Sequence, residues 1–232
     1  MLPLAKSLDT LGLFTHTPAD MLALWDAIGH PTDSTEDFPL GVPEPRPSVE
    51  PPMAAAFESA LTVLRSAGTT IRPIDFAGTL TKLAEANKTV MFFEGARFHE
   101  QRFKEYGSRL DADLVDLIQK GLEMPVERYD EARRFIAEWK GRFSEMYKAT
   151  PVILTPAAPG PAPFGLASTG DPRMNAPWTA LGTLAISIPM PVPSGLPLGL
   201  QLTADHGQDA RVLCTAVHLQ TILATASATV SI

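Results

Sequence analysis

"AISIPMPVPSGLPLGLQL", residues 185–202, contains no charged side chain, and the charge-free run extends from Met174 to Ala204. A helix that crosses a membrane needs about 20 consecutive apolar residues. Four prolines break this run, and each costs a helix interior about 3 kcal/mol: Pro189, Pro191, Pro193 and Pro197. The run therefore predicts no membrane segment but two short strands, Leu184–Pro189 and Leu198–Thr203, joined by a Pro/Gly loop. Because a strand covered on both faces is apolar throughout, we expect both strands to be buried in a covered sheet.

The whole chain has a globular composition, so we expect residues 1–232 to form a single domain. Hydrophobic residues make up 45% and charged residues 19% of its 232 residues. The formal net charge of -7 argues against a nucleic-acid partner, because phosphate binding needs clustered Lys and Arg. The single cysteine, Cys214, excludes an intrachain disulfide, and Lys6 interrupts the apolar start, so no signal peptide is expected. We therefore expect a cytoplasmic protein.

Around the two apolar strands, helical and extended patterns alternate, which is typical of an α/β fold. Apolar spacing predicts helices at 18–28, 53–67, 79–105, 111–121, 127–148 and 207–227. Further strands are expected at 38–42, 69–76 and 151–156, and an irregular loop at 157–178. Residues 79–148 form a helical layer with one apolar face, whereas residues 151–232 supply the sheet core and a closing helix.

The usual catalytic and cofactor motifs are missing from the sequence. It contains no P-loop, GxGxxG, HExxH, CxxC or GxSxG motif, and its five histidines are scattered. Cys214 and His218 lie four residues apart on a predicted helix, but a cysteine on an apolar helix face is usually a small core residue. We therefore expect no metal and no cofactor, and spacing alone reveals no active site.

Three segments together resemble the amidase signature family. They are "PLAKSLDTLGLFTHTPADMLALWDAI" at 3–28, "PVILTPAAPGPAP" at 151–163 and "GDPRMNAPWTALGTLAISIPMPVPSGLPLGLQLTADHGQD" at 170–209. The resemblance implies a mixed β-sheet covered by helices and hydrolysis of carboxylic amides, sometimes esters. It also implies a Ser–Ser–Lys triad in which lysine is the base and backbone N–H groups form the oxyanion hole.

The sequence departs from the family in the part that carries the triad. It has no Gly-Gly-Ser-Ser stretch and no lysine ahead of one, so it resembles the C-terminal half of an amidase. Lys6 and Ser7 are adjacent, but they match a segment that follows the family's catalytic region, and we carry no catalytic role onto them. Gly182-Thr183-Leu184 also replaces the usual Gly-x-Pro before the apolar strand.

Asn175, Trp178 and Thr179 match the family pattern for the segment that walls the substrate pocket. The resemblance implies that Trp178 packs on the apolar part of a substrate and that Thr179 hydrogen-bonds near the acyl site. The structural alternative is that Trp178 anchors the loop in the core and Asn175 caps a turn.

Three functional hypotheses remain open from the sequence. The chain is half of a hydrolase for a small amide or ester, and the N-terminal half is missing or comes from another chain. Alternatively, it is a non-catalytic binding module, for which we expect a homodimer because an open sheet edge invites pairing. The third hypothesis is a hydrolase with a different nucleophile, chosen from Ser168, Ser187 and Ser194.

Overall fold

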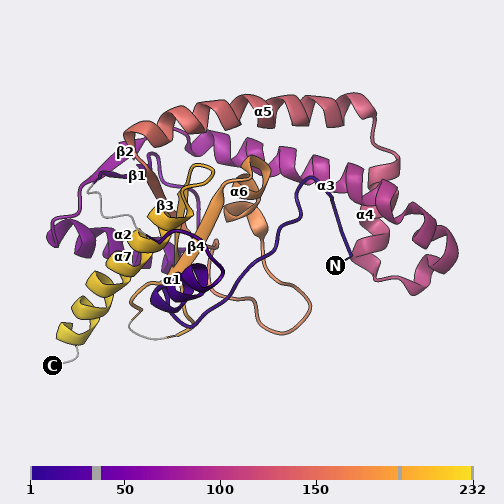
Figure 1. Ribbon diagram of the computed structural model, residues 1–232. Helices are drawn as coiled ribbons and strands as arrows, with labels where there is room; N and C mark the ends of the chain where they lie inside the picture. The colour runs from indigo at the N-terminus through magenta and orange to yellow at the C-terminus, as the bar shows by residue number, and fades with distance from the viewer. Residues whose placement is uncertain (1, 33–37, 193–194, 231–232) are drawn as a thin grey trace.

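A computed structural model describes residues 2–32, 38–192 and 195–230 (Figure 1). Its centre is a five-stranded sheet with the order β2-β1-β3-β5-β4. The strands are β1 Leu40–Pro43, β2 Ile71–Ile74, β3 Val152–Pro156, β4 Leu184–Pro189 and β5 Gly199–Ala204. Pairing is parallel for β2, β1 and β3 and antiparallel for β3–β5 and β5–β4. The predicted α/β fold with a mixed sheet is confirmed.

Helices cover the sheet from two sides. They are α1 Pro18–Ala27, α2 Pro51–Ser66, α3 Ala77–Tyr106, α4 Ala112–Leu122, α5 Val126–Ala149, α6 Ala176–Leu181 and α7 Asp209–Val230. Figure 1 shows α3 and α5 side by side across the top of the sheet and extending beyond it to α4. We call this extension the helical arm. It corresponds to the helical layer predicted at 79–148.

Two apolar cores lie on opposite faces of the sheet. Val152 and Leu154 of β3 belong to the core shared with α2 and α7, whereas Ile153 belongs to the core shared with α3, α5 and α6. This division follows from the two-residue period of a strand, which sends alternate side chains to opposite faces. The strand is buried at all five positions, as its uninterrupted apolar sequence predicts.

The burial predicted for the two strands of residues 185–202 is confirmed for β5 and wrong for β4. In β5 every residue from Leu200 to Ala204 is buried, but in β4 only Ile188 is buried. The reason is position, because β4 is an edge strand whose second face has no helix over it in the described structure. Leu184, Ile186 and Ile188 pack on the α7 side, and the opposite face is exposed at Ala185, Ser187 and Pro189.

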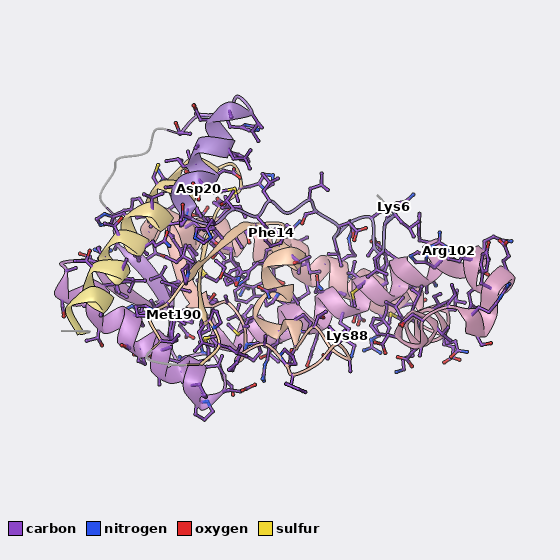
Figure 2. The ribbon with its side chains drawn as sticks, turned by 90° about the horizontal axis from the view of Figure 1, so that it is seen from below. Lys6, Phe14, Asp20, Lys88, Arg102 and Met190 are labelled. Carbon is purple, nitrogen blue, oxygen red and sulfur yellow. The ribbon has the colours of Figure 1, made fainter. Side chains whose placement is uncertain are left out.

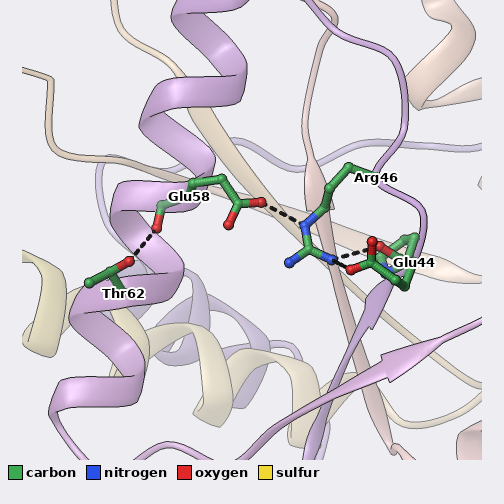
Figure 3. A network of polar contacts seen from close by, with 5 residues as sticks. Glu44, Arg46, Glu58 and Thr62 are labelled. Atoms are coloured by element: carbon green, nitrogen blue, oxygen red, sulfur yellow. Dashed lines mark hydrogen bonds and ion pairs between the residues drawn. The ribbon is translucent and has the colours of Figure 1, made fainter.

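Polar contacts fix helix starts and the end of the parallel strands. Thr17 accepts a bond from the Asp20 amide at 3.1 Å and donates its own amide to Asp20 Oδ2 at 3.0 Å, which closes a capping box before α1. Figure 3 shows Arg46, just after β1, bridging Glu44 and Glu58 of α2 with N–O distances of 2.6 Å. These contacts are largely exposed, so apolar burial supplies most of the packing energy.

None of the helices within the described residues is long and apolar enough to cross a membrane.

Candidate functional site

The predicted site residues lie on a short helix at the end of the loop that follows β3. Asp171 accepts a bond from the Arg173 amide at 2.9 Å and begins a 3-10 turn, and Asn175 immediately precedes α6. The helix ends at Gly182, whose φ of 65° is in the left-handed region that favours glycine. The expectation of an irregular loop throughout 157–178 is therefore wrong at its end, because six helical residues are too few to show a clear period in sequence.

Trp178 is buried in the second core with only 2% of its surface exposed. Its indole meets Phe143 edge-on at a centroid distance of 5.7 Å and Phe76 at 6.2 Å. These are favourable edge-to-face geometries for aromatic pairs. The packing matches the anchor role considered from the sequence, and contact with a substrate stays a prediction. The indole Nε1 is buried with no hydrogen-bond partner in the described structure.

Asn175 links α6 to the interior strand β5. Its Oδ1 accepts a hydrogen bond from Gln201 Nε2 at 3.3 Å. Thr179 is exposed, and its hydroxyl donates to the Asn175 carbonyl at 3.4 Å. The structure thus brings Asn175 and Gln201 together across 26 residues and leaves the Thr179 hydroxyl at the surface. We call Asn175, Trp178, Thr179 and Gln201 the α6–β5 wall.

A polar rung crosses the sheet beside this wall. Gln201 of β5 is the register partner of both Thr155 in β3 and Ser187 in β4. Thr155 and Gln201 are buried, and Thr155 Oγ1 and Gln201 Oε1 have no hydrogen-bond partner among the described residues. Ser187 is exposed on the open face of β4. Sequence reasoning missed Thr155 and Gln201, although Gln201 is the one amide side chain in the apolar run 185–202.

Close packing beside the rung requires a glycine at position 199. A Cβ built on Gly199 would lie 2.9 Å from Ala157 Cβ and overlap Ser187 Oγ. Two residues further along β5, Tyr147 of α5 donates its hydroxyl to Thr203 Oγ1 at 3.1 Å. Burial raises the pKa of Tyr147 well above its ordinary value of 10.0, so this phenol is a neutral donor. The phenol therefore links α5 to β5 inside the core, and Tyr147 cannot act as a base near neutral pH.

Two of the serines considered as alternative nucleophiles, Ser168 and Ser187, have no hydrogen-bonded base among the described residues. Ser168 Oγ accepts a bond from the Gly170 amide at 3.0 Å, which is a turn contact. Across residues 2–32, 38–192 and 195–230, no lysine or histidine side chain hydrogen-bonds to Ser168 or Ser187. Ser194 lies outside the described residues. Activation of a serine requires an adjacent base, so this geometry does not support the third hypothesis.

A catalytic pair of Cys214 and His218 receives no support from the described structure either. The Cys214 thiol donates to the Thr32 carbonyl at 3.1 Å, and His218 is exposed on α7. Where side chains are described, no group of three His, Cys, Asp or Glu residues is arranged to hold a metal ion. Cys214 therefore sits as a partly buried structural thiol.

A separate pocket of about 690 Å³ lies on the helical arm. It is lined by Lys6, Ser7, Phe93, Glu94, Arg97, Phe98 and Tyr129, and we call it the α3–α5 pocket. Glu94 accepts hydrogen bonds from the Ser7 amide at 3.0 Å, the Ser7 hydroxyl at 2.7 Å and the Tyr129 hydroxyl at 2.9 Å. Burial, and then the bond to Glu94, raises the pKa of Tyr129. Lys6 does not activate Ser7, because the Ser7 hydroxyl is held by Glu94.

The fold and its sequence match one family along most of the chain. The family model described as Amidase matches residues 1–213. The chain is 26% identical to the A-subunit of glutamyl-tRNA(Gln) amidotransferase from Thermus thermophilus and 30% identical to that from Thiobacillus denitrificans, over 92% and 73% of this chain. It is 25% identical to 2-amino-5-chloromuconic acid deaminase of Comamonas testosteroni over 96% of this chain. The chain therefore belongs to the amidase family, as the three sequence segments indicated.

The solved structures agree on the fold and on the extent of the match. A crystal structure of an amidase superimposes with a TM-score of 0.85 at 22% identity, covering 95% of this chain and 54% of the other. Coverage of the curated relatives is similar, at 55% of the Thermus protein, 53% of the Comamonas protein and 41% of the Thiobacillus protein. The chain thus spans about half the length of the relatives it matches.

Proposed function

We propose that this chain is the C-terminal half of a carboxylic amide or ester hydrolase and that it is inactive without an N-terminal half that carries the triad. The sequence contains no Gly-Gly-Ser-Ser stretch, and the match to the relatives covers about half of their length. The substrate in this proposal is a small amide or ester. Neither a metal nor a cofactor is needed for serine-based acyl transfer.

The observation that carries the proposal is the open side of β4. This edge strand has no charged residue, and its face at Ala185, Ser187 and Pro189 is exposed. Natural edge strands are usually blunted by charge, by extra twist or by a covering element. An uncharged edge next to the polar rung is therefore suited to a partner that completes the sheet and brings the nucleophile.

Large apolar side chains outside β4 are exposed as well. Leu11 is 82% exposed and Phe14 is 95% exposed in the segment between the helical arm and α1. Figure 2 shows Phe14 near the middle of the face seen from below. Phe164 and Leu166, in the loop after β3, are fully exposed. Together with the uncharged edge of β4, these exposed side chains favour a partner protein in the proposal.

In the assembled enzyme, the α6–β5 wall would receive the substrate. Asn175 and Thr179 would supply polar contacts, as the resemblance implies, and Trp178, which is 2% exposed, would support them from the core. Gln201 holds Asn175 in place through their hydrogen bond at 3.3 Å. A cytoplasmic location, which the single cysteine favours, is part of the proposal.

A fluorophosphonate probe with intact-mass readout tests the proposal, because it traps an activated serine as a covalent adduct. We expect no adduct on the purified chain. Co-expression with an amidase N-terminal half that contains the Gly-Gly-Ser-Ser stretch should give a complex and an adduct on that partner. Ser187→Lys should prevent the complex, whereas Ser66→Lys, an exposed position on α2, should not. A stoichiometric adduct on the isolated chain would refute the proposal.

The second candidate function is a non-catalytic binding module that pairs with itself. The uncharged edge of β4 favours this reading too, because two copies could pair their β4 strands. Light scattering would then give twice the chain mass of 25.0 kDa, and an added N-terminal half would leave that dimer intact. Displacement of the dimer by the N-terminal half would favour the half-enzyme.

A further inference from the structure

The α3–α5 pocket shares no lining residue with the α6–β5 wall and has no part in the function proposed above. Figure 2 shows Lys6 on the helical arm near Arg102, far from Met190 at the sheet. The volume of about 690 Å³ is within the usual range for small-molecule sites. Its residues come from the N-terminal segment, α3 and α5, so the pocket depends on how that segment is held.

Several contacts fix the N-terminal segment against α3. His99 Nε2 donates to the Pro3 carbonyl, with a distance of 3.0 Å, and His99 Nδ1 accepts from Arg102 at 3.2 Å. A Cβ on Gly95 would lie 3.1 Å from the Leu4 carbonyl oxygen, so the backbone passes close to the helix. Together with the Ser7–Glu94 bonds, these contacts place Lys6 at the pocket before any ligand arrives.

The charge balance of the pocket is positive. Glu94 is the one acidic lining residue, and it already accepts three hydrogen bonds and lies 3.6 Å from Arg133. Arg97 donates to the carbonyls of Phe93 and Gly121, each at 3.0 Å. In the part of the chain that the structure describes, neither Lys6 nor Arg97 has a carboxylate within 4.0 Å. Lys6 and Arg97 thus line the pocket without a carboxylate partner, whereas the charge of Glu94 is already balanced by its hydrogen bonds and by Arg133. The pocket is positive although the formal net charge of the chain is -7.

Aromatic rings form the rest of the lining of the α3–α5 pocket. Phe93 stacks on Tyr129 at a centroid distance of 4.2 Å, and the Arg97 guanidinium covers its other side at 3.3 Å. Phe98 is 37% exposed, and Lys6 Nζ lies 5.4 Å from its centroid. A flat apolar group can therefore contact Phe98 while an anionic group on the same molecule reaches Lys6 and Arg97.

We propose that the α3–α5 pocket binds a small organic carboxylate with a flat aromatic or unsaturated body. The carboxylate pairs with the Lys6 ammonium and the Arg97 guanidinium, and the body packs on Phe98 and the edge of Tyr129. Glu94 does not bind the ligand. It holds Ser7 and Tyr129 and so keeps Lys6 and the aromatic wall in position.

Titration of the purified chain with 2-naphthoate, followed by its fluorescence and by calorimetry, tests this site. We expect one site with a Kd below about 1 mM. The neutral 2-naphthamide, which keeps the ring system, should bind at least about tenfold more weakly, because a charge-assisted contact contributes roughly 1.4 kcal/mol or more. Lys6→Glu should produce a similar loss without affecting folding, since Lys6 is exposed.

Lys104→Glu is the matched control, because this α3 lysine is exposed like Lys6 but pairs with Glu100 outside the pocket. Its naphthoate affinity should match that of the unmodified chain. Three results would overturn the inference. The first is no saturable binding of 2-naphthoate up to about 10 mM. The others are equal affinity for 2-naphthamide and equal losses of affinity in Lys6→Glu and Lys104→Glu. Phe98→Ala separately tests the apolar contact and should weaken naphthoate binding severalfold.

Discussion

Gly121 of α4 is the position where one added methyl group should do the most damage to the helical arm. A Cβ there would lie 2.5 Å from Ala96 Cβ and 2.8 Å from the Phe92 carbonyl carbon, and it would overlap the Phe92 carbonyl oxygen. Ordinary contacts of this kind begin at 3.4 Å, so α3 and α4 would have to separate by roughly the missing distance, about 1 Å. The backbone of α3 cannot rotate away as a flexible side chain would.

The expected cost of Gly121→Ala follows from three terms. Overpacking of this size costs about 1–3 kcal/mol. Displacing the Gly121 carbonyl also weakens the bond that it accepts from Arg97 Nη1 at 3.0 Å, a charged contact that contributes about 1.5–3 kcal/mol. The better helix propensity of alanine returns about 1 kcal/mol. The net prediction is a loss of about 1.5–5 kcal/mol.

Gly141→Ala in α5 is the control for this prediction. Gly141 is exposed within a helix, and a Cβ there meets no atom within 4 Å. The same chemical change should therefore stabilise the chain by about 0.5–1 kcal/mol. Urea unfolding followed by circular dichroism, at equal m-values, measures both variants. If the two variants have the same unfolding midpoint, the close α3–α4 contact does not exist as described.

Two further substitutions test the α6–β5 wall and its surroundings. Trp178→Ala should cost about 3–5 kcal/mol in urea unfolding, because the indole is 2% exposed among aromatic rings; a loss under about 1 kcal/mol would mean that the side chain is not a core anchor. Tyr147→Phe should cost about 1 kcal/mol at neutral pH through the lost bond to Thr203. Because burial raises the pKa of Tyr147 in the folded state, the unfolded chain loses this proton first above pH 10, so stability falls with rising pH. Tyr147→Phe should flatten that alkaline loss, and an unchanged slope above pH 10 would contradict the assignment.

Elements with a strong local signal could be predicted from the sequence. The strands near 185–202 follow from four prolines and an uncharged run, and the helices of the arm follow from regular apolar spacing. The exposure of β4 could not be predicted in this way. An edge strand and a central strand can have the same apolar composition, and only the strand order decides which of them keeps an open face.

The sites depend on contacts between residues far apart in the sequence, and this limits what local patterns can show. Asn175 was visible in the family pattern, but its partner Gln201 comes from a different strand. In the α3–α5 pocket, Ser7 and Glu94 are separated by 87 residues, and Glu94 and Tyr129 by 35. No periodicity in a local window connects such residues. The pocket becomes apparent only when the N-terminal segment is placed against α3.

The position of the polar rung bears on where a nucleophile must approach. Thr155 and Gln201 are buried, so only the Ser187 end of the rung reaches the surface. The opposite face of β4 is closed by α7 through Leu184, Ile186 and Ile188. In the proposed complex, a group that attacks a substrate at the α6–β5 wall would therefore approach from the open side of β4. The exposed edge of β4 also has no charged residue. A partner that completes the sheet at β4 would thus satisfy the edge and bring its catalytic residues to the wall by the same contact.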